Sequence, residues 1–262
     1  MILYPEECKL STPLILDTHA HLDDSKFDED RAELIKQMQN NGVCNIITCG
    51  CDKASSQNAL KLANQYDFIY AAVGIHPENL SPEDTAEDIK KLAKEPKCVA
   101  IGEIGLDYYW GQNRNEQMEI FESQILLAKE LDLPIIVHDR EAHEDTLNLL
   151  LMHKPKGVVH CFSGSLNSAK QILNIGMYIG VGGVITFKNA KKLPEIVEYL
   201  PDDRILLETD CPYLAPEPYR GKVCHSGMIY LTAQKIAELR KQNVYDVLNF
   251  TSNNAKKLFC IK

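Results

Sequence analysis

The chain of 262 residues has no hydrophobic run that approaches the roughly 18 residues that a membrane-spanning helix needs. Its opening segment, MILYPEECKL, lacks the basic stretch followed by an apolar core that marks a secretory signal. Both absences predict a cytoplasmic protein that does not contact a membrane.

The sequence also lacks an excess of positive charge. Its 28 basic and 37 acidic residues give a formal net charge of −9. This balance argues against a protein that holds nucleic acid through a broad basic face, because such a face supplies most of the attraction to phosphates. A phosphate-bearing substrate would have to be attracted by local groups.

Disulfide bonds are a third absence that we expect. The cysteines number nine, which is odd, and a chain of this length can bury a core without disulfides, so we expect reduced thiols. Cys49 and Cys51 could bind a soft metal, but they lack the second cysteine pair of most zinc sites. We interpret both as small residues buried at the end of a strand.

A regular alternation of strand-like and helical segments runs through the chain, and no linker interrupts it. Eight apolar runs of strand length lie at residues 14–21, 43–50, 68–77, 99–105, 133–139, 157–162, 177–183 and 204–210. Helical patterns lie at 27–42, 55–66, 81–96, 115–132, 140–153, 165–176 and 189–200. We predict an α/β fold, a TIM (β/α)8 barrel that forms a single domain over residues 1–262.

Local signals refine this prediction. Gly42 should end the first helix, and Ser81 and Pro82 stand at expected cap and first-turn positions of the third. Two further helical patterns at 227–242 and 244–261 should pack on the outside of the barrel. A doubly wound open sheet is the rival architecture, but GVGG at 180–183 lacks the full glycine fingerprint of its nucleotide loop.

Side chains that ligate metals well stand at or just past the ends of the apolar runs: His19, His21, Glu103, His138, His160 and Asp210. A closed parallel barrel gathers the carboxyl ends of its strands into one ring, so residues far apart in the chain can share an ion. Each histidine alone would fit a hydrogen-bonded core residue, and the aspartate alone would fit a turn. Together they suit one or two divalent ions, magnesium, manganese or zinc.

Motifs along almost the whole chain carry a family resemblance. They are DTHAHLD at 17–23, GIHP at 74–77, IGEIGLDYY at 101–109, PIIVHDRE at 134–141, HCFSGS at 160–165, TFKNA at 186–190 and LLETDCPYLAP at 206–216. In these motifs the sequence resembles the TatD family of metal-dependent deoxyribonucleases, within the amidohydrolase type of barrel. The resemblance implies a site for two divalent ions, with His19, His21 and Asp210 on one, His138 and His160 on the other, and Glu103 between them.

One loop departs from the family pattern. The chain keeps RGK at Arg220–Lys222 but continues with VCHSG, where family members commonly have an Arg, Asn, Glu, Pro run. We expect a changed loop over the site, which keeps the metal ligands intact and leaves the substrate choice and the strength of the nuclease activity open. His225 in this loop is interpreted as a solvated residue, with orientation of substrate or help to a leaving group as the alternative.

Such a site predicts phosphodiester hydrolysis. Two neighbouring ions would lower the pKa of a shared water and clamp the substrate's oxygens, and Asp210 and Glu103 would be the catalytic residues. Asp210 would accept or orient the water's proton. The expected activity is that of a 3′–5′ deoxyribonuclease with single-stranded DNA or another nucleic acid as substrate.

Five side chains are candidates for substrate binding: His76, Tyr108, Arg140, Lys188 and His225. Arg140 and Lys188 could hold phosphate, although loop charges are usually just solvated. His76 could equally be a structural hydrogen-bonding residue, and Tyr108, with Tyr109, could stack on a base or simply pack at the rim.

Two other classes of function remain open. An amidohydrolase or an aminoacyl-tRNA deacylase would use the same ions to polarise the carbonyl of an amide or ester. A non-catalytic scaffold would bind ions without turnover, although no obligate protein partner is evident in the sequence.

Overall fold

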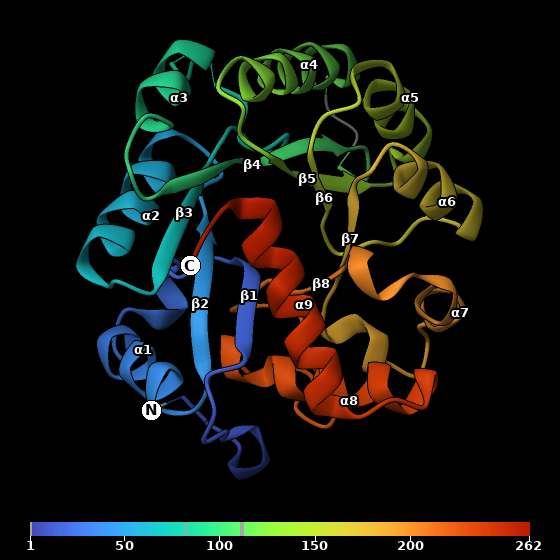
Figure 1. The fold of residues 1–262 in the computed structure, drawn as a ribbon. Helices are drawn as coiled ribbons and strands as arrows, with labels where there is room; N and C mark the ends of the chain where they lie inside the picture. Colours follow the sequence, from blue (N-terminus) through green and yellow to red (C-terminus); the bar gives the residue numbers. More distant parts are fainter. Residues whose placement is uncertain (1, 82, 111–112) are drawn as a thin grey trace.

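Eight parallel strands follow one another around a barrel in chain order, as Figure 1 shows from one end. The computed structural model describes residues 2–81, 83–110 and 113–262. The strands are β1 (Ile15–Ala20), β2 (Val43–Cys49), β3 (Ile69–Val73), β4 (Cys98–Asp107), β5 (Ile135–Arg140), β6 (Gly157–Val159), β7 (Tyr178–Val181) and β8 (Ile205–Leu207). The predicted TIM barrel is confirmed, and the open-sheet alternative is wrong because a doubly wound sheet reverses its strand order.

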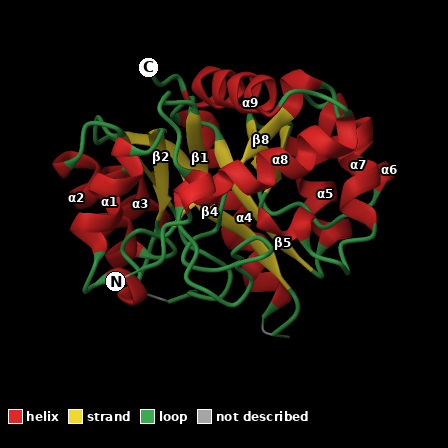
Figure 2. Cartoon of the chain, turned by 90° about the horizontal axis from the view of Figure 1, so that it is seen from below, coloured by secondary structure: helices red, strands yellow, loops and turns green. Residues whose placement is uncertain are grey.

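Helices lie between successive strands and after the last one, and most of them surround the barrel (Figure 2). They are α1 (Arg31–Asn40), α2 (Lys53–Gln65), α3 (Ala86–Leu92), α4 (Arg114–Glu130), α5 (His143–His153), α6 (Leu166–Asn174), α7 (Lys192–Tyr199), α8 (Ile229–Arg240) and α9 (Val244–Phe259). The strands are buried between this layer and the barrel interior, which explains why they read as continuous apolar runs. Among the described residues, no helix is long and apolar enough to cross a membrane.

The barrel closes where the last strand meets the first. Ala20 forms a parallel bridge with Cys211, the Asp210 N–H donates to the His19 carbonyl at 2.9 Å, and the His21 N–H donates to the Cys211 carbonyl at 2.8 Å. These bonds satisfy backbone groups that an open edge would leave unpaired. They also place Asp210 beside the two histidines of β1.

Both C-terminal helices lie outside the barrel, as predicted, but only α8 packs beside α7 in the surrounding layer. α9 crosses one end of the barrel, as both views show. Its Ala255 and Phe259 join one buried apolar cluster with Leu16, Val158 and Leu206, which lie near the starts of their strands. α9 therefore closes the amino-terminal end of the barrel, opposite the ends that carry the site. An amphipathic pattern reveals that a helix has an apolar face but not which surface that face covers.

One helix start differs from the prediction, and one helix end agrees with it. α3 begins only at Ala86, after Thr85, whose hydroxyl accepts the N–H of Asp88 at 3.2 Å. Ser81 therefore does not cap it, and Pro82 lies outside the described residues. α1 ends at Asn40, and Gly42 follows with a φ of 95°, a left-handed conformation that favours glycine.

Candidate metal centre

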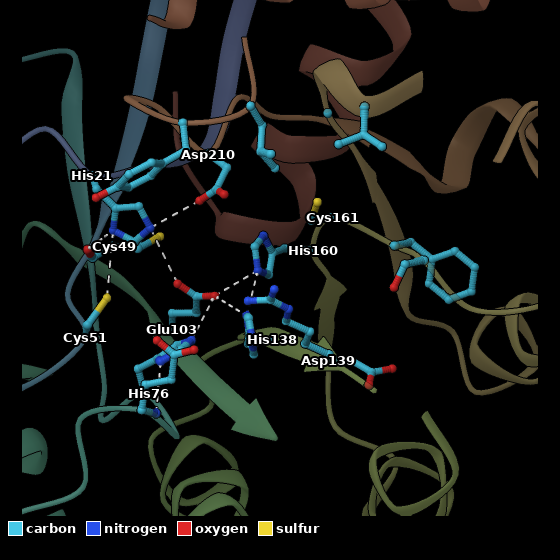
Figure 3. A pocket seen from close by; sticks show the side chains of 18 of the residues that line it. His21, Cys49, Cys51, His76, Glu103, His138, Asp139, His160, Cys161 and Asp210 are labelled. Carbon is cyan, nitrogen blue, oxygen red and sulfur yellow. Dashed lines mark hydrogen bonds and ion pairs between the residues drawn. The ribbon is translucent and has the colours of Figure 1, made fainter. Parts of the chain in front are cut away.

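Glu103 on β4 lies at the centre of the ring of polar side chains (Figure 3). Its Oε1 lies 2.9 Å from His138 Nδ1 and 2.8 Å from His160 Nε2. Its Oε2 lies 3.2 Å from His19 Nε2 and 3.5 Å from His21 Nε2. The two oxygens of one buried carboxylate thus face two different pairs of histidines.

Asp210, which follows β8, lies next to the pair formed by His19 and His21. Its Oδ1 lies 3.6 Å from His19 Nε2 and 3.3 Å from His21 Nε2, and the two imidazole nitrogens are 3.1 Å apart. Ligand atoms of His19, His21 and Glu103 lie within 4.8 Å of one another, as do those of His19, His160 and Asp210. The structure therefore brings together all six side chains for which the sequence predicts metal ligation.

Hydrogen bonds fix the ring orientation of two of the histidines. His21 Nδ1 lies 3.1 Å from the Cys49 carbonyl and donates to it, so Nε2 is the nitrogen that faces Asp210 and Glu103. In His138, Nε2 donates to Asp107 Oδ2 at 3.0 Å, so Nδ1 is the nitrogen that faces Glu103. Each of these nitrogens needs a cation or a proton between it and the carboxylate. Although burial opposes it, the neighbouring carboxylates raise the pKa of His21 and bring the pKa of His138 to about 10, so a proton that a metal ion can displace holds this place.

This arrangement fits divalent ions on the chemistry of the donor set. Histidines that ligate metals commonly donate their other ring N–H to a carbonyl or carboxylate, which fixes the tautomer and raises the basicity of the ligand. His21 and His138 both have such a partner. Mixed imidazole and carboxylate donors suit zinc, manganese and magnesium, with geometry deciding among them.

The two carboxylates are ionised. Burial raises the pKa of Glu103, but the imidazoles of His160, His19 and His76 outweigh it and hold the pKa well below its ordinary value. Burial likewise opposes ionisation of Asp210, and the hydrogen bond with His21 lowers its pKa overall. Two ionised carboxylates are therefore buried among histidines whose protons a divalent cation can displace.

A pocket of about 1180 Å³ opens over this centre. Two of the predicted substrate-binding residues line it, His76 and the exposed Arg140. His76 is buried, its Nε2 lies 3.6 Å from Glu103 Oε1, and burial lowers its pKa to about 3, so the ring is neutral. Lys188 does not line the pocket, whereas Lys191 and Lys192 just beyond it do.

Two other candidates lie away from the pocket lining. Tyr108 is buried, and its hydroxyl donates to Asp145 at 2.8 Å, in agreement with a packing role. The interpretation of His225 as a solvated residue is wrong. It is fully buried, its Nε2 lies 3.1 Å from the Leu3 carbonyl, and its ring stacks on Tyr4 at 4.4 Å.

The residues on either side of His225 in the VCHSG segment are buried as well. Cys224 and Ser226 are also fully buried, and no residue of the segment lines the pocket, so the expectation of a changed loop over the site is wrong. The segment packs instead through the 3₁₀ helix η5 (Ser226–Met228) against β1. A lone histidine in a loop gives no sequence signal for a partner more than two hundred residues away.

The two cysteines at the end of β2 both line the pocket. Cys49 is buried as predicted, with its Sγ 3.6 Å from His19 Nδ1. Cys51 is only half-buried, contrary to the prediction, and its Sγ lies 3.9 Å from His21 Nδ1.

Sequence reasoning missed two carboxylates that contact the histidines. Asp107 accepts from His138, as described, and belongs to the same IGEIGLDYY motif as Glu103. Glu208 accepts the N–H of Cys161 and lies 3.9 Å from His160 Nδ1. Gly180 on β7 is the one sequence feature that relates to Glu208. A side chain at this position would collide with the carboxylate, because a Cβ at Gly180 would lie 2.4 Å from Glu208 Oε2.

A (β/α)8 barrel with buried histidines and carboxylates at the carboxyl ends of its strands defines the class of metal-dependent barrel hydrolases. Comparison with known proteins gives the family. The chain matches the family described as TatD related DNase over residues 16–260. It belongs to this family, and the predicted family and class are confirmed.

Individual relatives agree along their whole length. The chain is 42% identical to the "uncharacterized metal-dependent hydrolase YabD" of Bacillus subtilis, over 95% of this chain and 100% of that protein. It is 34% identical to the "3′-5′ ssDNA/RNA exonuclease TatD" of Erwinia tasmaniensis, over 94% and 99% of the two chains. The crystal structure of YjjV, a TatD homologue from Escherichia coli K12, superposes with a TM-score of 0.89 at 32% identity, over 95% of this chain and 99% of that one.

Proposed function

We propose that the protein is a nuclease that hydrolyses phosphodiester bonds of single-stranded nucleic acid from the 3′ end with two divalent metal ions. The observation that carries the proposal is the position of Glu103, whose two oxygens face different histidine pairs at 2.8–3.5 Å. One buried carboxylate can in this way serve two neighbouring ions. The relative named as a 3′-5′ ssDNA/RNA exonuclease supports the substrate class and the direction.

Each ion would have its own set of ligands. His19, His21 and Asp210 would hold one ion, and His138 and His160 the other, with Glu103 shared between them. When bound, the ions would act as Lewis acids towards the phosphate oxygens and lower the pKa of a water. Magnesium, manganese and zinc are the candidates.

The chain's own groups would hold the substrate and move the proton. Asp210 stays ionised next to His21, so its carboxylate can accept or orient the proton of the attacking water. Arg140 and Lys191 line the pocket and can hold phosphate oxygens, the first as a bidentate donor. His76, which is neutral and faces Glu103, is a candidate for positioning the substrate.

The test combines metal content with cleavage. Glu103→Gln and Asp210→Asn should each lower metal occupancy, measured by elemental mass spectrometry, and reduce cleavage of a single-stranded oligonucleotide by at least about 100-fold, because even partners of ligands cost 10–100-fold. Asp203→Asn is the matched control. Asp203 is an exposed aspartate just before β8, the strand that Asp210 follows, and its loss should change neither quantity.

End-labelled substrates test the direction. A 3′–5′ exonuclease releases the label of a 3′-labelled oligonucleotide first and converts a 5′-labelled one into a descending ladder. Chelation of the metal should abolish both reactions, and added magnesium, manganese or zinc should restore them. Hydrolysis of carboxylic esters or amides without phosphodiester cleavage, or metal binding without any turnover, would reject the nuclease.

A further inference from the structure

Trp110, the single tryptophan of the chain, lines the pocket with 61% of its surface exposed. Burying a large apolar side chain is favourable, and tryptophan is enriched where a partner covers it. An exposed indole at the mouth of a pocket over the metal centre is therefore placed to contact a ligand.

A cation and a second ring fix the surroundings of this indole. The guanidinium of Arg140 lies 3.9 Å from the centre of the Tyr109 ring and 5.9 Å from that of Trp110. The rings of Tyr109 and Trp110 meet edge to face, with centres 4.8 Å apart. The Tyr109 N–H donates to Asp107 Oδ1 at 3.0 Å. In the strand register, Asp107 on β4 lies opposite Arg140 on β5. The group is thus held on the ends of two paired strands.

A flat apolar face next to a guanidinium matches one nucleotide unit, which joins a planar base to an anionic phosphate. Because the net charge of −9 repels a polyanion, non-ionic stacking would make an important contribution to affinity. A base offers its face only when it has left the duplex stack. Building on the proposed nuclease function, we propose that Trp110 stacks on an unpaired nucleobase of the substrate while Arg140 holds an adjacent phosphate.

Kinetics of Trp110→Ala test the stacking. For the metal-loaded enzyme and an oligothymidylate, KM should rise roughly 5- to 150-fold, the range found for loss of one base–aromatic stack, while kcat stays the same. With an oligonucleotide of equal length that carries abasic sites, KM should not change. Trp110→Phe keeps a flat ring and should regain most of the affinity. Tyr245→Ala, which removes an exposed aromatic ring from α9 at the other end of the barrel, is the matched control and should change nothing.

Salt dependence separates the two contacts. Trp110→Ala should leave the slope of log KM against log salt concentration unchanged, whereas Arg140→Ala should reduce it by about 1, the value of one phosphate contact. Fluorescence gives a direct readout, because all tryptophan emission comes from Trp110. A cleavage-resistant phosphorothioate oligothymidylate should quench it, and the abasic counterpart should not.

Three results would overturn the inference and leave the nuclease intact: an equal loss on the abasic substrate, a fall in kcat at unchanged KM, or equal cleavage of duplex and single strands. If the wild-type enzyme cleaves no oligonucleotide with any of the three metals, the proposed function itself fails and the inference fails with it.

Discussion

The hydrogen bond between Asp107 and His138 allows a sharp prediction about the metal centre. Asp107 is almost fully buried, its Oδ2 accepts from His138 Nε2 at 3.0 Å, and its Oδ1 accepts from the Tyr109 N–H at 3.0 Å. Both oxygens are therefore committed as acceptors. An asparagine at this position has only one acceptor oxygen and must abandon one of the two donors.

The substitution changes which nitrogen of His138 carries the ring proton. If the asparagine oxygen keeps the Tyr109 N–H, its amide group faces His138 Nε2, and the ring proton must move to Nδ1, the atom that faces Glu103. The lone pair proposed to ligate an ion is then lost. We expect Asp107→Asn to weaken metal binding by about 10- to 100-fold, or about 1.4–2.7 kcal/mol, the range for loss of a partner of a ligating histidine.

Calorimetric titration of the metal-free protein measures this loss directly, and activity at increasing metal concentration should shift by the same factor. Asp145→Asn is the matched control, because Asp145 accepts from the hydroxyl of Tyr108 rather than from a histidine. A dissociation constant within twofold of the wild-type value in Asp107→Asn would refute the reasoning.

Three further predictions concern stability. Burial lowers the pKa of His225 to about 4, so the unfolded chain binds more protons between pH 6.5 and 4, and stability should fall by up to about 3 kcal/mol as the pH drops through that window. Denaturant titrations of His225→Gln across this range should show a flatter pH dependence, and an unchanged one would contradict the assignment. Phe259→Ala should cost about 3–5 kcal/mol of unfolding free energy in urea titrations, because Phe259 is buried at the closed end of the barrel, and a loss below 1 kcal/mol would count against that role. Gly180→Ala should lower the melting temperature and cost about 1–3 kcal/mol by pressing on Glu208, whereas Gly182→Ala, with a Cβ contact of 3.6 Å, should be tolerated; equal effects would reject the explanation.

The barrel and the ring of ligands could be predicted because the information is local. Each strand is an apolar run that ends in a polar side chain, and parallel closure then brings those ends together whatever their distance in the chain. The spacing of His19 and His21 was enough to predict them as ligands, and the place of Glu103 in a buried apolar run was enough to predict it.

The features that the sequence could not reveal are contacts between segments that lie far apart in the chain. The burial of His225 is set by Leu3 and Tyr4 at the other end of the chain, and a histidine without periodic neighbours gives no sign of that contact. The partnership of Asp107 with His138 depends on the register of β4 and β5, which apolar patterns leave open. Trp110 has no periodic neighbours either. Its exposure indicates substrate binding only once the structure places it next to Arg140.

The seam between β8 and β1 has a consequence for biosynthesis. Asp210 meets His19 and His21 through backbone bonds that join the first strand to the segment after the last, so these three side chains cannot come together before residue 211 has been made. Glu103 and the histidines of the intervening strands are made earlier, but they lack this half of the centre. A chain that stops before β8 therefore lacks Asp210 and cannot complete the predicted set of six ligands.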